Sequence, residues 1–445
     1  MSPALPSTAV HLDAALAAEQ VRSRMPSLVA AVVRRGEVVW SGARGRTVRA
    51  GEDERPSADT QYRIGSITKS LVAALVLLAR EDGLVDLAEP VGRYVPDVPF
   101  GDATVRSLLA HAGGLPAEPA GSWWERSPGV SYEALAAAHA DAQRVLPTGE
   151  RFHYSNLAYG ILGRLVETVR GRGWYADLTE RILEPLGMTR TSYDAEGDAA
   201  QGYAVEALTG AVVPEPHQDT GAMAPAGQLW STTGDLARWL TEIADPRVLS
   251  PASVTAMVTP QSAGPDDALA ATYGLGLQQV ADGDRVLVGH GGSMPGFLAG
   301  AWVDRASGVG VALLANGAYG LDGRGLVSTL VGTLLAHEPT VADEWLPTAE
   351  VPAAVREILG TWHWGHQPFV LSYADGAIRL SADGGRSFTF VPDAPDAWVG
   401  TSGYHDGETL RVERRRDGSV SHLDVGTFCY TRVPYDPSAP IPGED

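Results

Sequence analysis

Hydrophobic and polar positions recur with different periods along the chain, and these periods predict its elements. Over residues 9–23 the apolar side chains recur near helical spacing, whereas 27–34 and 37–41 read as two strands around the turn Arg35-Gly36. A nearly continuous apolar run follows over residues 70–78 and predicts a helix. The N-terminal part of the chain is therefore predicted to contain a helix, an antiparallel hairpin and a second helix, in that order.

Between residues 105 and 187 the period is mainly helical. The helices that we expect there are separated by Gly- and Pro-rich turns and span 107–111, 131–143, 156–170 and 174–186. Residues 191–228 are rich in Gly, Pro and small side chains, which indicates a cleft rim, and residues 231–235 supply an N-cap for a helix that ends at Ile243. We interpret this region as a helical lobe inserted between strands.

From residue 273 the pattern changes to strands. The predicted strands cover 275–280, 285–290, 299–304 and 308–316, and a helix over 325–335 follows them. The N-terminal hairpin and this meander can pair into one antiparallel sheet flanked by helices. The prediction for residues 1–340 is therefore an α/β (α+β) domain with a helical lobe beside its sheet.

Prolines interrupt the periodicity between residues 338 and 352 and mark a domain boundary. The strands predicted beyond it are short and separated by turn residues: 360–364, 369–373, 377–381, 387–392, 397–401, 409–413, 422–425 and 427–433. This spacing is typical of a small antiparallel barrel. We therefore expect a second, all-β domain over residues 353–445.

Composition and charge narrow the class of protein. The 445 residues carry a formal net charge of -20, which argues against nucleic acid or an anionic membrane as the main partner. The sequence shows neither a secretory signal pattern nor a run near the about 20 apolar residues of a membrane span, so we expect a cytoplasmic protein. The single cysteine, Cys429, excludes an internal disulfide framework and a multi-cysteine metal site, and we expect neither metal nor cofactor.

Lys69 is the only lysine in the sequence, because Lys and Arg total 34 and 33 of these are arginine. A GC-rich genome explains the shortage, since asparagine is also reduced to Asn156 and Asn316, but it does not explain the one lysine that remains. Arginine cannot lose its proton in a protein, whereas a lysine amine can act as a base. Lys69 is therefore a candidate titrating group.

Ser66 precedes Lys69 by three residues, so both side chains share one face of a helix's first turn. A serine hydroxyl needs a base to become a nucleophile, and the helix N-terminus lowers the pKa of a nearby amine. The same helix end offers free backbone N–H groups, including that of Ser66, for an oxyanion. This spacing favours a nucleophile with its base, although an N-cap serine beside a surface lysine would give the same pattern.

Two further segments carry groups that suit acyl transfer. Tyr154 and Asn156 lie two apart in an extended stretch and point to the same side, where a phenol can pass a proton and an amide can bind a carbonyl. His290 ends an apolar strand and precedes two glycines, which permit a substrate backbone to lie along the strand edge near the N–H of Ser293. A helix N-cap and a glycine turn are the structural alternatives.

The three elements Ser66-x-x-Lys69, Tyr154-x-Asn156 and His290-x-Gly292, in this order, resemble the serine β-lactamase and penicillin-binding protein superfamily. The similarity is to its class C-like branch, which includes D-peptidases, family VIII esterases and peptide-cyclising thioesterases. It covers residues 10–337 and includes the stretches 108–116 and 225–232. The C-terminal strands resemble the lipocalin-like domain that follows many of these enzymes.

The resemblance implies a role for each matched residue. Ser66 would accept the acyl group, Lys69 and Tyr154 would share general acid/base work, and Asn156 would align the substrate. The backbone N–H groups of Ser66 and Ser293 would form the oxyanion hole. His290 stands where true β-lactamases carry a lysine, so efficient β-lactamase activity is not expected.

The sequence does not identify the acyl group that is transferred. A small-molecule or peptide substrate of a D-peptidase or esterase fits the pattern, and so does a carrier protein that delivers a peptidyl thioester for hydrolysis or cyclisation. An acylatable sensor without turnover is the alternative from another class. Further candidates for substrate binding are Gly291, Gly292, Trp230 and Arg432.

Overall fold

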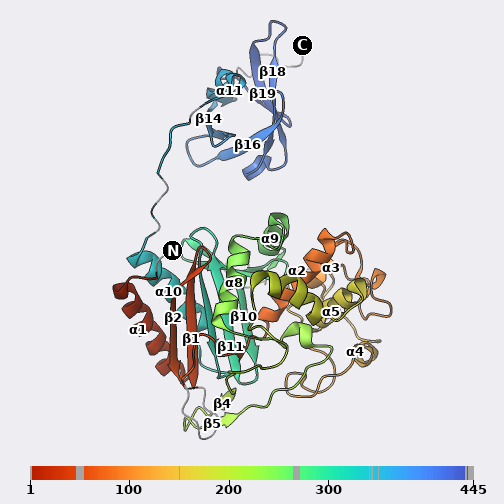
Figure 1. Cartoon of the computed structure of the whole chain (residues 1–445). Coiled ribbons are helices and arrows are strands. Elements are labelled where there is room, and N and C mark those ends of the chain that lie inside the picture. The colour runs from red at the N-terminus through yellow and green to blue at the C-terminus, as the bar shows by residue number, and fades with distance from the viewer. Residues whose placement is uncertain are drawn as a thin grey trace. The chain divides into compact units, whose positions relative to one another are not determined.

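The structure is a computed structural model that describes residues 3–46, 55–149, 151–263, 271–339, 341, 344–348, 350–435 and 438. The chain divides into two compact units, residues 1–340 and 341–445 (Figure 1). The first unit has a mixed α/β fold and the second is an antiparallel barrel, so both predicted fold classes are confirmed.

An eight-stranded sheet forms the centre of the first unit, in the order β2-β1-β12-β11-β10-β9-β8-β7. The strands are β1 (Ser27–Arg34), β2 (Glu37–Gly45), β7 (Ser262–Ala263), β8 (Ala271–Tyr273), β9 (Gln278–Asp282), β10 (Arg285–Met294), β11 (Phe297–Asp304) and β12 (Val309–Ala315). β1 pairs antiparallel with both β2 and β12. The expected pairing of the N-terminal hairpin with the meander is therefore confirmed.

Helices cover both faces of this sheet, with α1 (Pro6–Ser23) and α10 (Gly323–His337) on one face and α8 (Thr233–Ala244) on the other (Figure 1). Successive side chains of a strand point to opposite faces. Leu28 and Ala30 of β1 accordingly join the hydrophobic cluster under α1 and α10, whereas Val29 and Val33 join the cluster under α8. A strand covered on both faces explains why residues 27–33 are all buried.

The helical lobe is built around α2 (Ile67–Glu81), whose residues from Ile67 to Ala79 are all buried. The other lobe elements are α3 (Val105–Leu109), α4 (Tyr132–Ala138), α5 (Asn156–Arg170), α6 (Trp174–Leu178), a π-helical turn (Thr179–Leu183), α7 (Glu184–Leu186), α9 (Pro251–Val258) and 3-10 turns at Val91–Arg93 and Ala224–Ala226. Two small ladders pair β3 (Tyr62–Arg63) with β6 (Trp230–Ser231) and β4 (Tyr203–Val205) with β5 (Val212–Pro214).

One difference from the expected elements matters for function. β10 continues to Met294 instead of ending at His290, because its glycines pair with β11 in the same register as the residues before them. On the other side, β9 pairs with β10 only as far as Gly289. The end of β10 therefore has a partner strand on one side only. In addition, α4 ends at Ala138, and α9 was not predicted.

The second unit is a meander in which each strand pairs with the next along the chain. Its elements are α11 (Ala353–Ile358), β13 (Gly360–Trp364), β14 (Gln367–Ala374), β15 (Ala377–Ser381), β16 (Ser387–Ala394), β17 (Ala397–Gly400), a 3-10 turn (Gly403–His405), β18 (Thr409–Arg414), β19 (Val420–Val425) and β20 (Phe428–Tyr430). Backbone hydrogen bonds between His363 and Thr431 nearly close the barrel. Trp362, Phe369 and Phe390 fill its interior.

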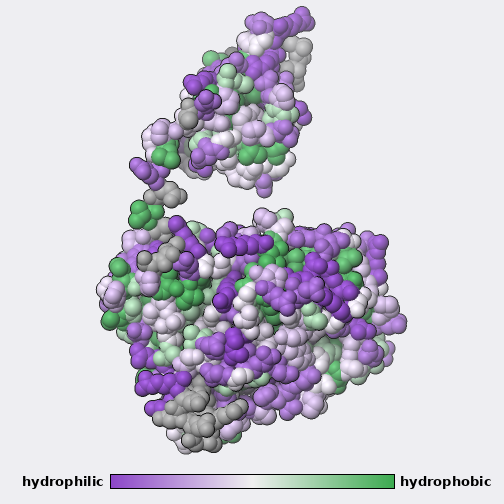
Figure 2. Space-filling model, viewed as in Figure 1, coloured by the Kyte–Doolittle hydropathy of each residue, from purple (hydrophilic) through white to green (hydrophobic). Residues whose placement is uncertain are grey.

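Hydrophilic residues are spread over the face of the first unit that Figure 2 shows, with hydrophobic residues in smaller groups between them. Across the described ranges, none of the helices has both the length and the apolar character needed to cross a membrane.

Candidate active site

Ser66 lies between β3 and the first residue of α2, and its half-buried side chain does not cap the helix. Gly65 has φ 51°, and a Cβ at this position would lie 2.6 Å from the backbone nitrogen of Ser293. A Cβ at Gly292 would lie 1.9 Å from the carbonyl oxygen of Ile64. Both positions require glycine so that β10 can contact the turn before Ser66. This contact places Ser66 and Ser293 in the lining of one cavity.

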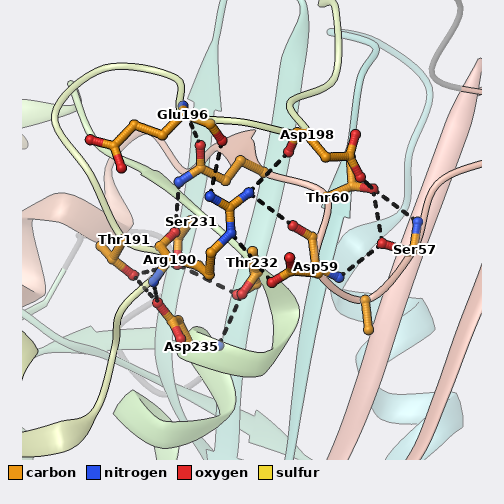
Figure 3. A network of polar contacts seen from close by, with 12 residues as sticks. Ser57, Asp59, Thr60, Arg190, Thr191, Glu196, Asp198, Ser231, Thr232 and Asp235 are labelled. Atoms are coloured by element: carbon orange, nitrogen blue, oxygen red, sulfur yellow. Dashed lines mark hydrogen bonds and ion pairs between the residues drawn. The ribbon is translucent and has the colours of Figure 1, made fainter.

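A polar network holds the segment that leads into this turn (Figure 3). The Thr60 hydroxyl donates to the Asp198 carboxylate at 2.6 Å, and the Arg190 guanidinium donates to the backbone carbonyls of Asp59 and Asp198 at 3.3 Å each. The Arg190 backbone N–H donates to the Asp235 carboxylate at 2.8 Å. The network joins the segment before β3 to α8, so the chain enters the Ser66 turn from a fixed direction.

Lys69 places its Nζ 2.9 Å from Ser66 Oγ and 2.6 Å from the carbonyl oxygen of Ala226. The side chain is fully buried, and burial lowers the pKa of Lys69 from 10.5 to about 7, against the opposing effect of the Glu118 and Glu125 carboxylates. The carbonyl can only accept a hydrogen bond. A neutral amine therefore donates one N–H to Ala226 and keeps its lone pair for the proton of Ser66.

Tyr154 lies beside the same amine, with Lys69 Nζ 5.0 Å from the centre of its ring. Burial raises the pKa of Tyr154 well above its usual range, and hydrogen bonding to Ser66 opposes this increase. The phenol consequently keeps its proton at neutral pH. It can donate a proton or a hydrogen bond, and of these two groups only the neutral Lys69 amine can accept a proton.

His111 holds the backbone on both sides of Tyr154. Its Nδ1 accepts a hydrogen bond from the Ser155 N–H at 3.1 Å, its carbonyl accepts from the His153 N–H at 2.7 Å, and its ring centre lies 4.2 Å from that of Tyr154. Burial lowers the pKa of His111 well below its usual value, so the ring is neutral. Sequence reasoning assigned no role to His111, because contacts to residues more than 40 positions away leave no local pattern.

Asn156 begins α5, and the neighbouring Ser155 is the N-cap, since its hydroxyl accepts a hydrogen bond from the Ala158 N–H at 3.1 Å. The Asn156 amide donates to Glu118 Oε1 at 2.7 Å, and Glu118 Oε2 accepts from the indole N–H of Trp124 at 2.7 Å. The structure thus gives Asn156 a carboxylate partner that the sequence did not reveal. Glu118 also brings a negative charge to the lobe side of the site.

His290 lies buried in β10, with its Nδ1 next to the carbonyl oxygen of Gly291 and its Nε2 3.1 Å from the hydroxyl of Tyr273. Because a carbonyl only accepts, Nδ1 carries the proton and Nε2 accepts from Tyr273. Burial is the main cause that lowers the pKa of His290 to about 3; the hydrogen bond to the Gly291 carbonyl opposes this shift, and the nearby Lys69 adds a smaller lowering effect. This environment is compatible with a hydrogen-bonding role for His290 and not with a charge on its ring.

The cavity has a volume of about 670 Å³ and is lined by residues that include Ser66, Tyr154 and His290, together with Gly291 and Gly292. In the parts of the chain that the structure describes, no group of three His, Cys, Asp or Glu side chains is placed to hold a metal ion.

Two of the candidate substrate-binding residues, Trp230 and Arg432, make their contacts outside the cavity that contains Ser66. Trp230 is only 2% exposed, does not line the cavity, and packs its ring against Phe297 at 5.2 Å. Arg432 belongs to the second unit, where its guanidinium donates to the carbonyls of residues 357, 359 and 361 and lies 3.9 Å from the centre of the Trp362 ring. The contacts of Trp230 are those of a core packing residue. The hydrogen bonds of Arg432 hold the first strand of the barrel in place.

Comparison with known proteins gives a family match for each unit. The model described as Beta-lactamase matches residues 12–332, and one described as Domain of unknown function (DUF7586) matches residues 351–432. “Putative beta-lactamase-like 1” of Homo sapiens is 27% identical over 415 residues, which cover 88% of this chain and 81% of that protein. “D-alanyl-D-alanine-carboxypeptidase/endopeptidase AmpH” of Escherichia coli (strain K12) is 29% identical over 208 residues, 44% of this chain and 51% of that protein.

The chain spans only about half the length of some relatives, namely 51% of AmpH and 46% of “Beta-lactamase-like protein 2” of Dictyostelium discoideum. Among solved structures, “Crystal structure of SurE with D-Leu” has a TM-score of 0.60 and 26% sequence identity. That alignment covers 96% of this chain and 100% of the other.

Proposed function

Because the chain belongs to the Beta-lactamase family, we propose that it is a serine hydrolase that forms an acyl-enzyme on Ser66 with peptide-like or ester substrates. One observation carries this proposal: a fully buried amine with a pKa of about 7 lies 2.9 Å from the Ser66 hydroxyl. General bases are most effective when their pKa lies near the working pH. Lys69 meets this condition near neutrality, which an exposed lysine would not.

In the proposed acylation step, Lys69, Tyr154 and two backbone N–H groups act on Ser66 and the substrate. Neutral Lys69 takes the hydroxyl proton as Ser66 Oγ bonds to the substrate carbonyl carbon, and the resulting oxyanion receives hydrogen bonds from the backbone N–H groups of Ser66 and Ser293. The bond to the leaving group then breaks. Tyr154 gives its proton to the departing atom and regains one from the Lys69 ammonium, so the amine is neutral again.

Deacylation reverses the direction of proton flow. Lys69 removes a proton from a water molecule that attacks the ester of Ser66, and the same two N–H groups stabilise the second oxyanion. Proton return to Ser66 Oγ releases the acid product. The amide of Asn156, held by Glu118, is proposed to align the acyl chain during both steps.

Two similar proteins support a D-configured acyl donor. AmpH is described as a D-alanyl-D-alanine carboxypeptidase/endopeptidase, and SurE was crystallised with D-Leu. We therefore expect a D residue on the acyl side of the bond that is cleaved. A carrier-bound peptidyl thioester would use the same acyl-enzyme, and the identity of its product would distinguish hydrolysis from cyclisation.

The proposal is tested by labelling with a fluorophosphonate, followed by a panel of D- and L-aminoacyl nitrophenyl esters, D-Ala-D-Ala peptides and linear peptidyl thioesters, with products identified by mass. We expect one label on Ser66, its loss in Ser66→Ala, and turnover that favours D esters. Lys69→Arg is the matched control, because it keeps a cation that cannot act as a base. Labelling without turnover of any substrate would favour a sensor, and labelling of Ser66→Ala would contradict the assigned nucleophile.

A further inference from the structure

Tyr154, the group that we propose as proton donor to the departing atom, lies in a stretch of irregular backbone over residues 152–155. Its orientation toward Ser66 therefore depends on contacts from elsewhere in the chain. One residue, His111, binds the backbone on both sides of it: the His111 carbonyl accepts from the His153 N–H at 2.7 Å, and Nδ1 accepts from the Ser155 N–H at 3.1 Å. The direction of the phenol is thus set by a residue 44 positions before Ser155.

The imidazole of His111 is itself held in a cluster of aromatic rings. Its centre lies 4.2 Å from the ring centre of Tyr154, 4.6 Å from that of Tyr273 and 5.2 Å from that of Tyr159. The Tyr159 hydroxyl donates to the carbonyl of Leu109 at 3.0 Å, and the Tyr273 hydroxyl is hydrogen-bonded as well, so both rings have fixed orientations. Because a closely packed interior leaves the imidazole no room to turn, its ring presents a fixed surface to Tyr154.

Histidine is unfavourable at position 111 for two separate reasons. His111 follows α3 and has φ 53°, a left-handed conformation in which glycine or asparagine usually ends a helix. Since Nδ1 accepts from Ser155, the neutral ring carries its proton on Nε2, and this atom is buried without a hydrogen-bond partner among the described residues. Both features lower the stability of the fold. Their coincidence at one residue indicates that the imidazole serves the site.

We propose that His111 is a positioning residue that holds the Tyr154 phenol toward Ser66 and the departing atom. The inference rests on the proposed function and adds one residue to it. His111 does not belong to the lining of the cavity that contains Ser66, so it contacts no substrate and transfers no proton. It acts through Tyr154: Nδ1 fixes the backbone that follows the phenol, and the imidazole packs against the phenol ring.

An isosteric pair of variants separates the hydrogen-bond acceptor from the shape of the side chain. Asparagine and leucine have the same branched shape, but only His111→Asn keeps an acceptor at the place of Nδ1. Turnover is measured on an N-acetyl-D-alanine anilide, whose leaving group needs a proton, and on the matching nitrophenyl ester, whose leaving group does not. We expect His111→Leu to lower the anilide-to-ester ratio about tenfold, the size of effect for loss of one hydrogen bond, and His111→Asn to restore much of the ratio.

A double-mutant cycle shows whether this effect passes through Tyr154. In the Tyr154→Phe background, His111→Leu should change the ratio no further, because the group that it positions is already absent. His139→Leu is the matched control, and its ratio should equal that of the wild type. The imidazole of His139 is also buried and accepts a backbone N–H, from Ala120 at 3.0 Å, but it lies outside the ring cluster around Tyr154.

Rates are normalised to the folded fraction of each variant that a fluorophosphonate labels to completion, so that loss of folding does not imitate loss of positioning. Equal losses on the anilide and the ester in His111→Leu would overturn the inference, and so would a ratio in His111→Asn as low as that in His111→Leu. A further fall of the ratio in the double variant would also overturn it. Failure of both substrates to acylate the wild-type protein would instead contradict the proposed function.

Discussion

The site contains two buried bases, Lys69 on α2 and His290 on β10, and burial has a different consequence for each of them. Burial lowers the pKa of both side chains, from 10.5 to about 7 for Lys69 and from 6.5 to about 3 for His290. The amine is left with a pKa near neutrality, whereas the imidazole is left without a charge above about pH 4. The starting pKa of a buried base therefore decides whether burial makes it a titrating group or a neutral one.

The hydrogen bonds of the two side chains also separate a titrating base, Lys69, from a neutral group, His290. Lys69 has one carbonyl partner, Ala226, and directs its remaining capacity to Ser66. Both ring nitrogens of His290 are occupied, by Gly291 and Tyr273. We therefore expect substitutions at the two positions to have effects of different size on the acylation rate and on its pH dependence.

The largest effect is expected from Lys69→Ala, which removes the base from Ser66. Acylation by a nitrophenyl ester should slow by about 1000-fold, within the range for loss of a general base. Stopped-flow measurement of the acylation rate checks this, and Lys69→Arg should be almost as slow. Acylation within tenfold of the wild-type rate in both variants would assign the base to another group.

Tyr154→Phe should have the next largest effect, about 100-fold on turnover, because a protonated phenol supplies the leaving-group proton. The loss should be greater for an anilide, whose leaving group needs a proton, than for a nitrophenyl ester, whose leaving group does not. Steady-state rates on a matched anilide and ester pair measure this difference. Equal losses on both substrates would limit Tyr154 to orienting Ser66.

His290→Gln should change the acylation rate by less than about tenfold, because it replaces one neutral hydrogen-bonding group by another. The pH dependence of acylation should stay the same, since the imidazole is uncharged above about pH 4 on the basis of its pKa of about 3. Acylation rates from pH 5 to 9 provide the measurement. A shift of the midpoint by one pH unit would show that His290 carries charge in the working enzyme.

The smallest effect on catalysis is expected from Arg432→Ala. The guanidinium holds backbone carbonyls around β13 and covers Trp362, so its loss should destabilise the second unit by about 1 kcal/mol. Acylation of Ser66 should be unchanged. Thermal unfolding together with the acylation rate tests both parts, and a marked rise in KM at unchanged stability would instead favour a substrate contact.

Local patterns allowed much of the fold to be predicted, because strand alternation and helix periodicity depend on neighbouring residues. The Ser66–Lys69 spacing was informative for the same reason, since both residues lie in one helical turn. The partners that define their chemistry were not predictable: Ala226 lies 157 positions from Lys69, and Glu118 lies 38 positions from Asn156. The glycines after His290 predict the end of a strand, whereas in the structure their pairing with β11 continues it.

The central claim is that neutral Lys69 is the base for Ser66, and the pH dependence of Ser66 acylation tests it most directly. With its pKa lowered to about 7, the amine is protonated below this pH and cannot accept the Ser66 proton. Acylation by a nitrophenyl ester should therefore rise with pH through a midpoint near 7 and then level off, and this midpoint should vanish in Lys69→Ala. A midpoint near 7 that persists in Lys69→Ala, or a wild-type rate that does not change between pH 5 and 9, would contradict the claim.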